Sequence, residues 1–282
     1  MNKALSWQNI KQAIGVFFRH FILIIWCATT IFPFLWSLLT AFKNNNQIFI
    51  HPFSWPNPVI ADNFPQIFRT LDIPTGFMNS IIYSAVTVII VTLLSSMVGF
   101  YLSKCTRNRI LHTYFITGIM IPIQAIIVPL FINIRNIGLG NTRAGIIIVY
   151  IVYNLSFSIL IMTEFIRSSV PDEIIEASVI DGCKPLAVFF RIVMPLSKPG
   201  NATIGTFIFI NVWNEFLCAL IFLAKNNLKT LNLTTFRLRG QYSSEYGLIA
   251  AGVIVLIIPA MVVYALFQEQ VVKGLTAGAV KG

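Results

Sequence analysis

The sequence has few charged residues: Asp, Glu, Lys and Arg make up only 11% of its 282 residues, while hydrophobic residues make up 56%. A soluble globular domain usually carries about 25% charged residues, so this composition excludes an ordinary soluble protein. Acidic residues are the scarcest, with 10 Asp and Glu against 20 Lys and Arg, and the net charge is +10. Because the basic residues lie between apolar runs rather than on one face, they indicate membrane borders and not a nucleic-acid surface.

The chain also lacks the sequence patterns of several kinds of functional site. Its four cysteines show no paired spacing and its three histidines are scattered, so we expect free thiols and no metal site. The sequence contains no Gly-x-x-x-x-Gly-Lys-[Ser/Thr] loop to hold nucleotide phosphates. The apolar runs contain no paired aspartates and no nucleophile–base arrangement, and we therefore expect no catalytic residue and no enzymatic activity.

What the sequence does contain is a series of hydrophobic runs of about 20 residues, each long enough to cross a bilayer as a helix. They predict an all-α, polytopic membrane protein with six transmembrane helices. The first run shows no cleavage pattern, so we expect it to be retained as a span. The predicted spans are residues 21–42, 77–103, 110–134, 144–165, 203–223 and 247–267.

Six spans place both termini on one side of the membrane, and the positive charges predict which side that is. The short loop after the second span carries Lys104, Arg107 and Arg109. Because cytoplasmic loops are enriched in Lys and Arg, we predict that both termini and the loop at residues 167–200 are cytoplasmic. Residues 43–76, which are rich in Asn and Pro, predict a compact polar loop on the outer side.

The polar interruption at residues 167–200 is the only long one between apolar runs that carries helix signals of its own. Ser168 or Ser169 can cap a short helix that starts near Pro171, and Gly182 is suited to end it in a left-handed conformation. A second short helical run follows between two prolines. A short helix with a small-residue face beside a membrane is shaped to fit another protein's groove, although any polytopic protein also needs amphipathic loop helices.

Glu215 is the most costly residue within the predicted spans, because an ionised carboxylate at bilayer depth costs on the order of a few kcal/mol unless it is paired or hydrated. Asn211 and Asn214 precede it in the fifth span. Two interpretations are open: a polar lining of a water-filled translocation path or subunit interface, or a helix–helix hydrogen-bond site near the membrane border.

Gln124 lies between Pro122 and Pro129 in the third span, a pattern that predicts a broken helix whose freed carbonyl groups need partners. We interpret this segment as a bend or gate. At the end of the fourth span, Glu164 and Arg167 predict an ion pair at the membrane border.

The stretch 167–200 also resembles the cytoplasmic coupling loop of bacterial ABC-importer permeases, in which a Glu-Ala-Ala segment precedes Asp-Gly and a more distant proline. Three further segments resemble the maltose and multiple-sugar permeases: residues 120–130 their third span, residues 213–216 their fifth-span motif, and residues 273–282 the tail of the smaller maltose-type subunit. The matching loop residues are Glu176, Ala177, Ser178, Asp181, Gly182, Ile192 and Pro195, with Ser178 in place of the third alanine.

This resemblance implies a type I ABC-importer permease fold and a set of partners in a bacterial cytoplasmic membrane. A second, different permease subunit pairs with the chain, two ATP-binding-cassette ATPase subunits bind ATP and magnesium, and an extracytoplasmic solute-binding protein delivers the cargo. This chain itself is expected to bind no cofactor. The resemblance places ATPase coupling at Glu176, Ala177, Ser178, Asp181 and Gly182 and ATPase contact in the tail at Gly274, Gly278 and Lys281; the polar groups predict a path or subunit interface at Gln124, Asn211, Asn214 and Glu215.

We predict three regions: residues 1–76 with the first transmembrane helix and an extracytoplasmic loop, residues 77–268 as the permease core, and residues 269–282 as a cytoplasmic tail. The implied function is uptake of a sugar or oligosaccharide by alternating access. Within this class, the alternative cargo is a polyol or glycerol phosphate. Outside it, the alternative is a channel or ion-coupled secondary transporter, which would carry more intramembrane carboxylates than Glu215 and Glu164 provide.

Overall fold

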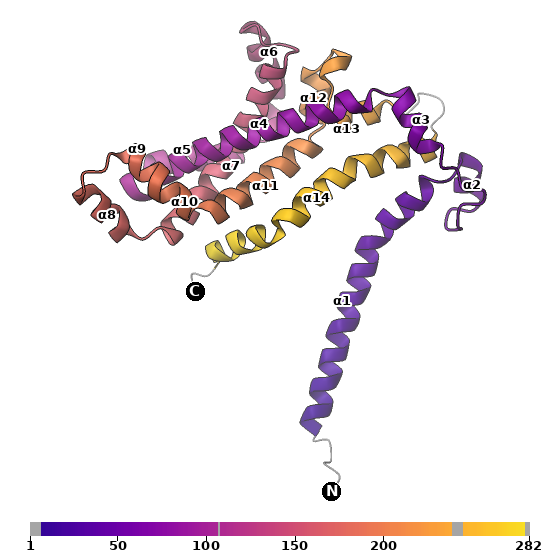
Figure 1. Cartoon of the computed structure of the whole chain (residues 1–282), viewed down its shortest axis with the longest axis horizontal. Helices are drawn as coiled ribbons and strands as arrows, with labels where there is room; N and C mark the ends of the chain where they lie inside the picture. Colours follow the sequence, from indigo (N-terminus) through magenta and orange to yellow (C-terminus); the bar gives the residue numbers. More distant parts are fainter. Residues whose placement is uncertain (1–6, 107, 239–244, 280–282) are drawn as a thin grey trace. The chain divides into compact units, whose positions relative to one another are not determined.

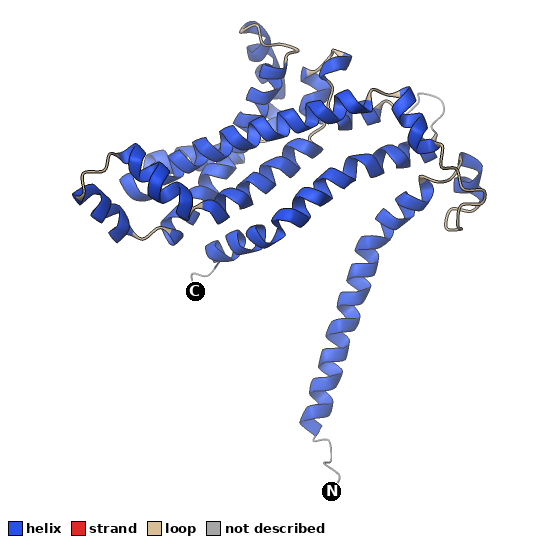
Figure 2. Cartoon of the chain, viewed as in Figure 1, coloured by secondary structure: helices blue, strands red, loops and turns tan. Residues whose placement is uncertain are grey.

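The computed structural model describes residues 7–106, 108–238 and 245–279, and within these ranges every regular element is a helix (Figure 2). The all-α prediction is therefore confirmed. The chain divides into two compact units, which are unit 1 (residues 1–70 and 238–255) and unit 2 (residues 71–237 and 256–282).

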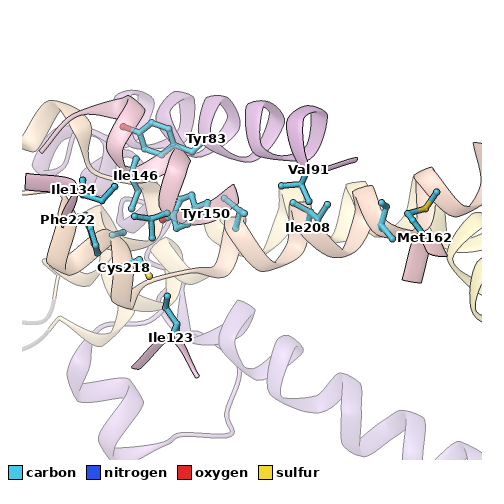
Figure 3. Packing of buried hydrophobic residues seen from close by; sticks show 14 of the residues in the cluster. Tyr83, Val91, Ile123, Ile134, Ile146, Tyr150, Met162, Ile208, Cys218 and Phe222 are labelled. Atoms are coloured by element: carbon cyan, nitrogen blue, oxygen red, sulfur yellow. The ribbon is translucent and has the colours of Figure 1, made fainter. Parts of the chain in front are cut away.

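Unit 2 is built on three long helices that pack along one another (Figure 1): α4 (Ile73–Phe100), α7 (Arg143–Ser169) and α11 (Lys198–Asn214). Asp72 caps the first of them, because its Oδ1 accepts a hydrogen bond from the Thr75 N–H over 3.3 Å. Buried side chains from all three helices meet between them, among them Tyr83, Val91, Ile146, Tyr150, Met162 and Ile208 (Figure 3).

Helices α4 and α7 approach each other closely at Gly99. A Cβ atom at this position would lie 3.0 Å from the carbonyl carbon of Met162 and 3.0 Å from the amide nitrogen of Thr163. Small residues permit such packing between helices in membranes, and α4 has several more of them on its buried face: Ser84, Thr87, Ser95 and Ser96.

Short elements connect the long helices of unit 2 and supply its loops. In chain order they are η1 (Tyr101–Cys105), α5 (Arg109–Thr117), η2 (Gly118–Met120), α6 (Ile123–Asn136), α8 (Asp172–Ile180), α9 (Pro185–Val188), η3 (Phe189–Val193), α10 (Met194–Leu196), α12 (Leu217–Phe222), η4 (Asn226–Leu228) and α13 (Leu231–Phe236).

The third predicted span is broken, as its prolines indicated. The helical pair Arg109–Met120 and Ile123–Asn136 is bent by 97°. Ile121 has an extended backbone and Pro122 precedes the first residue of α6, so the break lies just before Gln124. Pro122 has no N–H to continue the earlier helix, which accounts for the position of the bend.

The structure contains several helices that are long and apolar enough to cross a bilayer, which confirms a multi-pass membrane architecture. Residues 203–223, the fifth predicted span, lie on α11 and α12, which are separated at Glu215 and Phe216. The count of six spans stays a prediction. In the described part of the chain the long helices are Ile14–Thr40, Ile73–Cys105, Arg143–Ser169 and Tyr246–Glu269, and the bent pair counts as a fifth span if it crosses as one.

Unit 1 contains α1 (Trp7–Thr40), α2 (Asn45–Ile50), α3 (Asn63–Thr70) and the first part of α14 (Tyr246–Ala279), whose later residues belong to unit 2. The connection after α1 folds around the buried Lys43, whose Nζ donates to the carbonyl oxygens of His51 and Pro52, each over 3.1 Å. The Asn- and Pro-rich segment predicted as a polar loop is thus compact, and it contains two short helices.

Candidate functional site

The loop at residues 167–200, which we call the coupling loop, lies at one end of unit 2, with α12 and α13 at the other end (Figure 1). Its first helix, α8, begins at Asp172 after Pro171, and no side chain among the described residues caps its N-terminus. The predicted serine cap is wrong: Ser168 still belongs to α7, where its Oγ donates to the Phe165 carbonyl over 3.0 Å. Instead, Asp172 and Glu173 place negative charge in the first turn, which favours the helix N-terminus.

The C-terminal end of α8 has the hydrogen bonds of a Schellman motif. Gly182 adopts φ +77°, the left-handed conformation predicted for it. Its N–H donates to the Val179 carbonyl over 3.0 Å, and the Cys183 N–H donates to the Ser178 carbonyl over 2.9 Å. A residue with a Cβ is strained at such a φ, so glycine fixes where α8 stops and where the chain turns back.

The two sides of α8 differ in exposure. Ser178 is buried, and its Oγ donates to the Ile175 carbonyl over 2.7 Å. Glu176, Ala177, Asp181 and Gly182 are exposed. Apolar side chains are exposed on the same short helix and on the start of α9: Ile174 at 43%, Val179 at 62%, Ile180 at 86% and Leu186 at 62%. These exposed apolar side chains make this end of α8 a candidate interaction surface.

The base of α8 is attached to the long helices by one ion pair and one buried side chain. Lys104, in η1 at the end of α4, pairs with Asp172, and the lysine side chain is only 4% exposed whereas that of Asp172 is 73% exposed. Val170, between α7 and α8, is buried. The predicted border pair is also present, with Arg167 Nη1 2.7 Å from Glu164 Oε1. Sequence reasoning counted Lys104 only as a border charge and missed its partner.

The second half of the coupling loop packs against the core of unit 2 through some of its side chains. Val188, Phe189 and Val193 are buried, and the Phe189 ring lies 6.1 Å from the Phe100 ring between centroids. The chain then enters α11 at a close contact, because a Cβ on Gly200 would lie 2.7 Å from Cγ of Phe165. The coupling loop therefore consists of a protruding helix on a base packed against α4, α7 and α11.

The second candidate site is the polar group at the break between α11 and α12. The Glu215 carboxylate accepts hydrogen bonds from the N–H groups of Cys218 at 2.6 Å and Ala219 at 3.0 Å, the first turn of α12. The buried Tyr150 hydroxyl donates to the same carboxylate over 3.0 Å. A negative group at a helix N-terminus is favourable, so Glu215 is stabilised where it lies.

Asn211 does not join Glu215 but lies near α7. Its Nδ2 donates to Oδ1 of the buried Asn154 over 2.9 Å. The two amides line a cavity of about 220 Å³ together with Phe157 and Phe207. Sequence reasoning missed Asn154, although a polar amide within an otherwise apolar span was a signal that could have found it.

The remaining residues predicted for the path and for the ATPase contact lie in several different places. Asn214 is exposed, and its backbone carbonyl accepts from Nδ2 of Asn232 over 3.0 Å. Gln124 is exposed at the start of α6. Gly274 and Gly278 lie within α14, and Lys281 lies outside the described residues. No group of three or more His, Cys, Asp or Glu side chains suited to a metal ion occurs among the described residues.

These features define a polytopic helical membrane protein with a short exposed helix at one end of unit 2 and a hydrogen-bonded polar group inside. The chain belongs to the family of binding-protein-dependent transport system inner membrane components, whose model matches residues 92–276. The resemblance seen in the sequence is thereby confirmed.

The relatives of this chain cover nearly all of it. It is 30% identical over 263 residues to the diacetylchitobiose uptake system permease protein of Streptomyces coelicolor, covering 92% of this chain and 87% of that protein. It is 30% identical over 276 residues to the multiple sugar-binding transport system permease protein of Streptococcus mutans, with 96% and 99% covered. Its fold is similar to a chain of a bacterial ABC transporter involved in the import of the acidic polysaccharide alginate, at TM-score 0.79 and 20% identity, covering 92% of this chain and 97% of that one.

Proposed function

We propose that this chain is a permease subunit that takes up a sugar or oligosaccharide by alternating access, driven by separate ATPase subunits docked on the coupling loop. Family membership supports the class of protein, and the names of the two relatives support a saccharide cargo. The observation that carries the coupling mechanism is the attachment of α8 to α4 through the Lys104–Asp172 ion pair, which leaves the apolar end of α8 exposed.

The exposed end of α8 is the proposed ATPase contact. Val179 and Ile180 supply apolar side chains that a groove on the partner would bury, which is how a short helix is recognised in a groove. Glu176, Ala177, Asp181 and Gly182 are exposed with them and form the rest of this contact. Ser178 contributes from the inner side, where it packs α8 against its own base.

The base of the coupling loop is the part that transmits movement. A force on α8 reaches α4 through Asp172 and Lys104, and it reaches α7 through the buried Val170. Phe189, packed against Phe100, carries the same movement into the core. Because packed interiors deform little, a shift of α8 would move the three long helices with it and change which side of the membrane the path opens to.

The polar groups within unit 2 are the proposed lining of that path, or of the interface with the second permease. The Asn154–Asn211 pair and the neighbouring rings of Phe157 and Phe207 offer amide groups for hydroxyls and aromatic faces for a sugar ring. Gln124 and Asn214 add further exposed amides. Glu215 acts mainly as the brace that holds the start of α12, because its carboxylate is already hydrogen-bonded.

The remaining partners follow from the same assembly. A second, different permease subunit pairs with this chain, and an extracytoplasmic binding protein delivers the cargo, in accord with the binding-protein-dependent family. The tail at Gly274, Gly278 and Lys281 contacts the ATPases, which bind ATP and magnesium. Both termini then lie in the cytoplasm of a bacterium, and this chain performs no chemical step itself.

The test compares two glycines with nearly the same positive φ, Gly182 at +77° and Gly138 at +78°. Each is changed to Val in the complete transporter, which is reconstituted in proteoliposomes with ATP inside and the binding protein and labelled oligosaccharide outside. Valine is strained at both positions, but only Gly182→Val distorts the end of α8. We expect loss of uptake for Gly182→Val and near-normal uptake for Gly138→Val.

Two results would contradict the coupling mechanism, and a third would contradict the cargo. Normal ATP-driven uptake by Gly182→Val would show that the geometry of α8 does not matter for coupling. Uptake by the isolated chain in an ion gradient, without ATPase subunits, would favour the secondary transporter. If a polyol or glycerol phosphate competed for uptake and oligosaccharides did not, the proposed cargo would be wrong. The proposed ABC mechanism would still hold.

A further inference from the structure

We propose that unit 2 contains a binding site for the phosphate of an anionic phospholipid headgroup. The site is a cavity of about 660 Å³ next to the base of the coupling loop. Residues from η1 and the short segment after it, the start of α5, the end of α7 and the first turn of α8 line it. Its basic and acidic side chains are Lys104, Arg109, Arg167 and Asp172.

The lining carries more positive than negative charge. Three of these side chains are cations and one is a carboxylate, and the carboxylate of Asp172 is paired with Lys104. Arg167 is paired with Glu164, which lies outside the lining. Arg109 is exposed and has no ion pair among the described residues. An anion entering the cavity therefore meets one guanidinium without an ion pair among the described residues and two cations that each pair with one carboxylate.

Two further features of the lining suit a phosphate group. Lys104 is a buried ammonium whose carboxylate partner is largely exposed to solvent, so a second anion would lower the cost of its burial. Nε2 of His112 is buried and has no hydrogen-bond partner among the described residues. A buried polar atom without a partner is unusual, and it leaves His112 with an unused hydrogen-bonding group beside the cavity.

The position of the cavity favours a lipid over a soluble phosphate. Two candidate spans end beside it, Ile73–Cys105 and Arg143–Ser169, so the cavity lies at the depth of lipid headgroups whichever way the chain is oriented. On α5, Ile110 and Tyr114 are 82% and 70% exposed, one turn apart and next to the cavity residues Arg109 and Thr113. These apolar side chains can lie against acyl chains while the phosphate binds the cations, a pattern typical of basic lipid sites.

The test measures lipid retained by the complete transporter after extraction from nanodiscs that contain equal amounts of phosphatidylglycerol and phosphatidylcholine. Native mass spectrometry counts the lipids that stay bound. The variants are Arg109→Gln, which breaks no ion pair within the part of the chain that the structure describes, and the double variant Arg109→Gln with Arg167→Gln. Arg135→Gln is the matched control, because Arg135 is an exposed arginine beyond the opposite end of α7.

We expect the wild type to retain phosphatidylglycerol in preference to phosphatidylcholine. Each charge removed from the cavity should weaken this retention about fivefold, the effect of a basic residue near an anionic surface, while Arg135→Gln should leave it unchanged. Inorganic phosphate at millimolar concentration should not displace the lipid. Unchanged retention in Arg109→Gln, an equal loss in Arg135→Gln, or displacement by inorganic phosphate would each overturn the lipid site, the last in favour of a soluble phosphate.

Discussion

The Tyr150 hydroxyl donates a hydrogen bond to the Glu215 carboxylate across 3.0 Å, from α7 to the break between α11 and α12. The same carboxylate accepts the N–H groups of Cys218 and Ala219. One acidic side chain therefore caps a half-helix and joins it to a neighbouring long helix. Because ionised groups at membrane depth are tolerated only when they are paired or hydrated, these three donors explain how Glu215 is accommodated.

The first prediction concerns this hydrogen bond. Tyr150→Phe removes one donor from the carboxylate and should lower the stability of the detergent-solubilised transporter by about 2 kcal/mol, the usual contribution of a hydrogen bond to a charged group. Thermal unfolding measures the change. Tyr153→Phe is the control, because Tyr153 lies on the same helix but is 41% exposed. Equal melting temperatures for Tyr150→Phe and wild type would mean that water replaces the bond at no cost.

The second prediction concerns the ion pair between Lys104 and Asp172. Asp172→Asn leaves a buried ammonium without its countercharge, whereas Lys104→Met leaves a carboxylate that is 73% exposed and can be hydrated. Removing one partner of an ion pair is costly when the charge left behind is buried, and only Asp172→Asn leaves such a charge. We therefore expect Asp172→Asn to destabilise the transporter more than Lys104→Met does.

Both substitutions should reduce ATP-driven uptake, because each detaches α8 from α4. The control is Asp62→Asn, which breaks an ion pair whose side chains are 75% and 64% exposed and should have little effect. A greater loss of stability in Lys104→Met than in Asp172→Asn would contradict the burial argument.

The features that depend on neighbouring residues could be predicted from the sequence. Gly182 ends α8 in the left-handed conformation, and Glu164 pairs with Arg167 three residues away. The prediction that a serine caps α8 was wrong, and the reason also lies in neighbouring residues. Val170 precedes a proline, which disfavours the helical conformation at that residue; α7 therefore runs on through both serines and ends before Val170, which is extended.

The pairs that build the sites could not be predicted in the same way. Lys104 and Asp172 lie 68 residues apart, and Tyr150 and Glu215 lie 65 residues apart. Whether two such residues meet depends on the rotation and register of packed helices, which hydrophobic periodicity leaves open. A comparison of polar residues predicted to lie at the same membrane depth in two spans could have suggested that Asn154 meets Asn211. It could not have selected this pair over others.

The third prediction tests the exposed tip of α8. Ile180 is 86% exposed, so Ile180→Glu should not disturb the fold of this chain, but it would place a charge in an apolar groove of the partner. Burial of an unpaired charge is costly, and the ATPase should no longer co-purify with the permease. Ile137→Glu is the control, since Ile137 is 64% exposed at the end of α6, away from the coupling loop. Full recovery of the ATPase with Ile180→Glu would place the docking surface elsewhere.

The fourth prediction concerns the contact between α4 and α7 at Gly99. The Cβ of Gly99→Ala would lie 3.0 Å from two backbone atoms of α7, at Met162 and Thr163, and backbone atoms cannot yield as a flexible side chain can. The helices must therefore separate, which should cost about 1–3 kcal/mol as overpacking does.

Gly205→Ala is the matched control on α11, because its Cβ would lie 3.5 Å from a side-chain atom of Val88, an ordinary contact. There alanine should be neutral or stabilising by up to about 1 kcal/mol, since glycine is the poorer helix former. Thermal unfolding of both variants decides the matter, and a Gly99→Ala protein as stable as Gly205→Ala would mean that α4 and α7 are less tightly packed than this geometry requires.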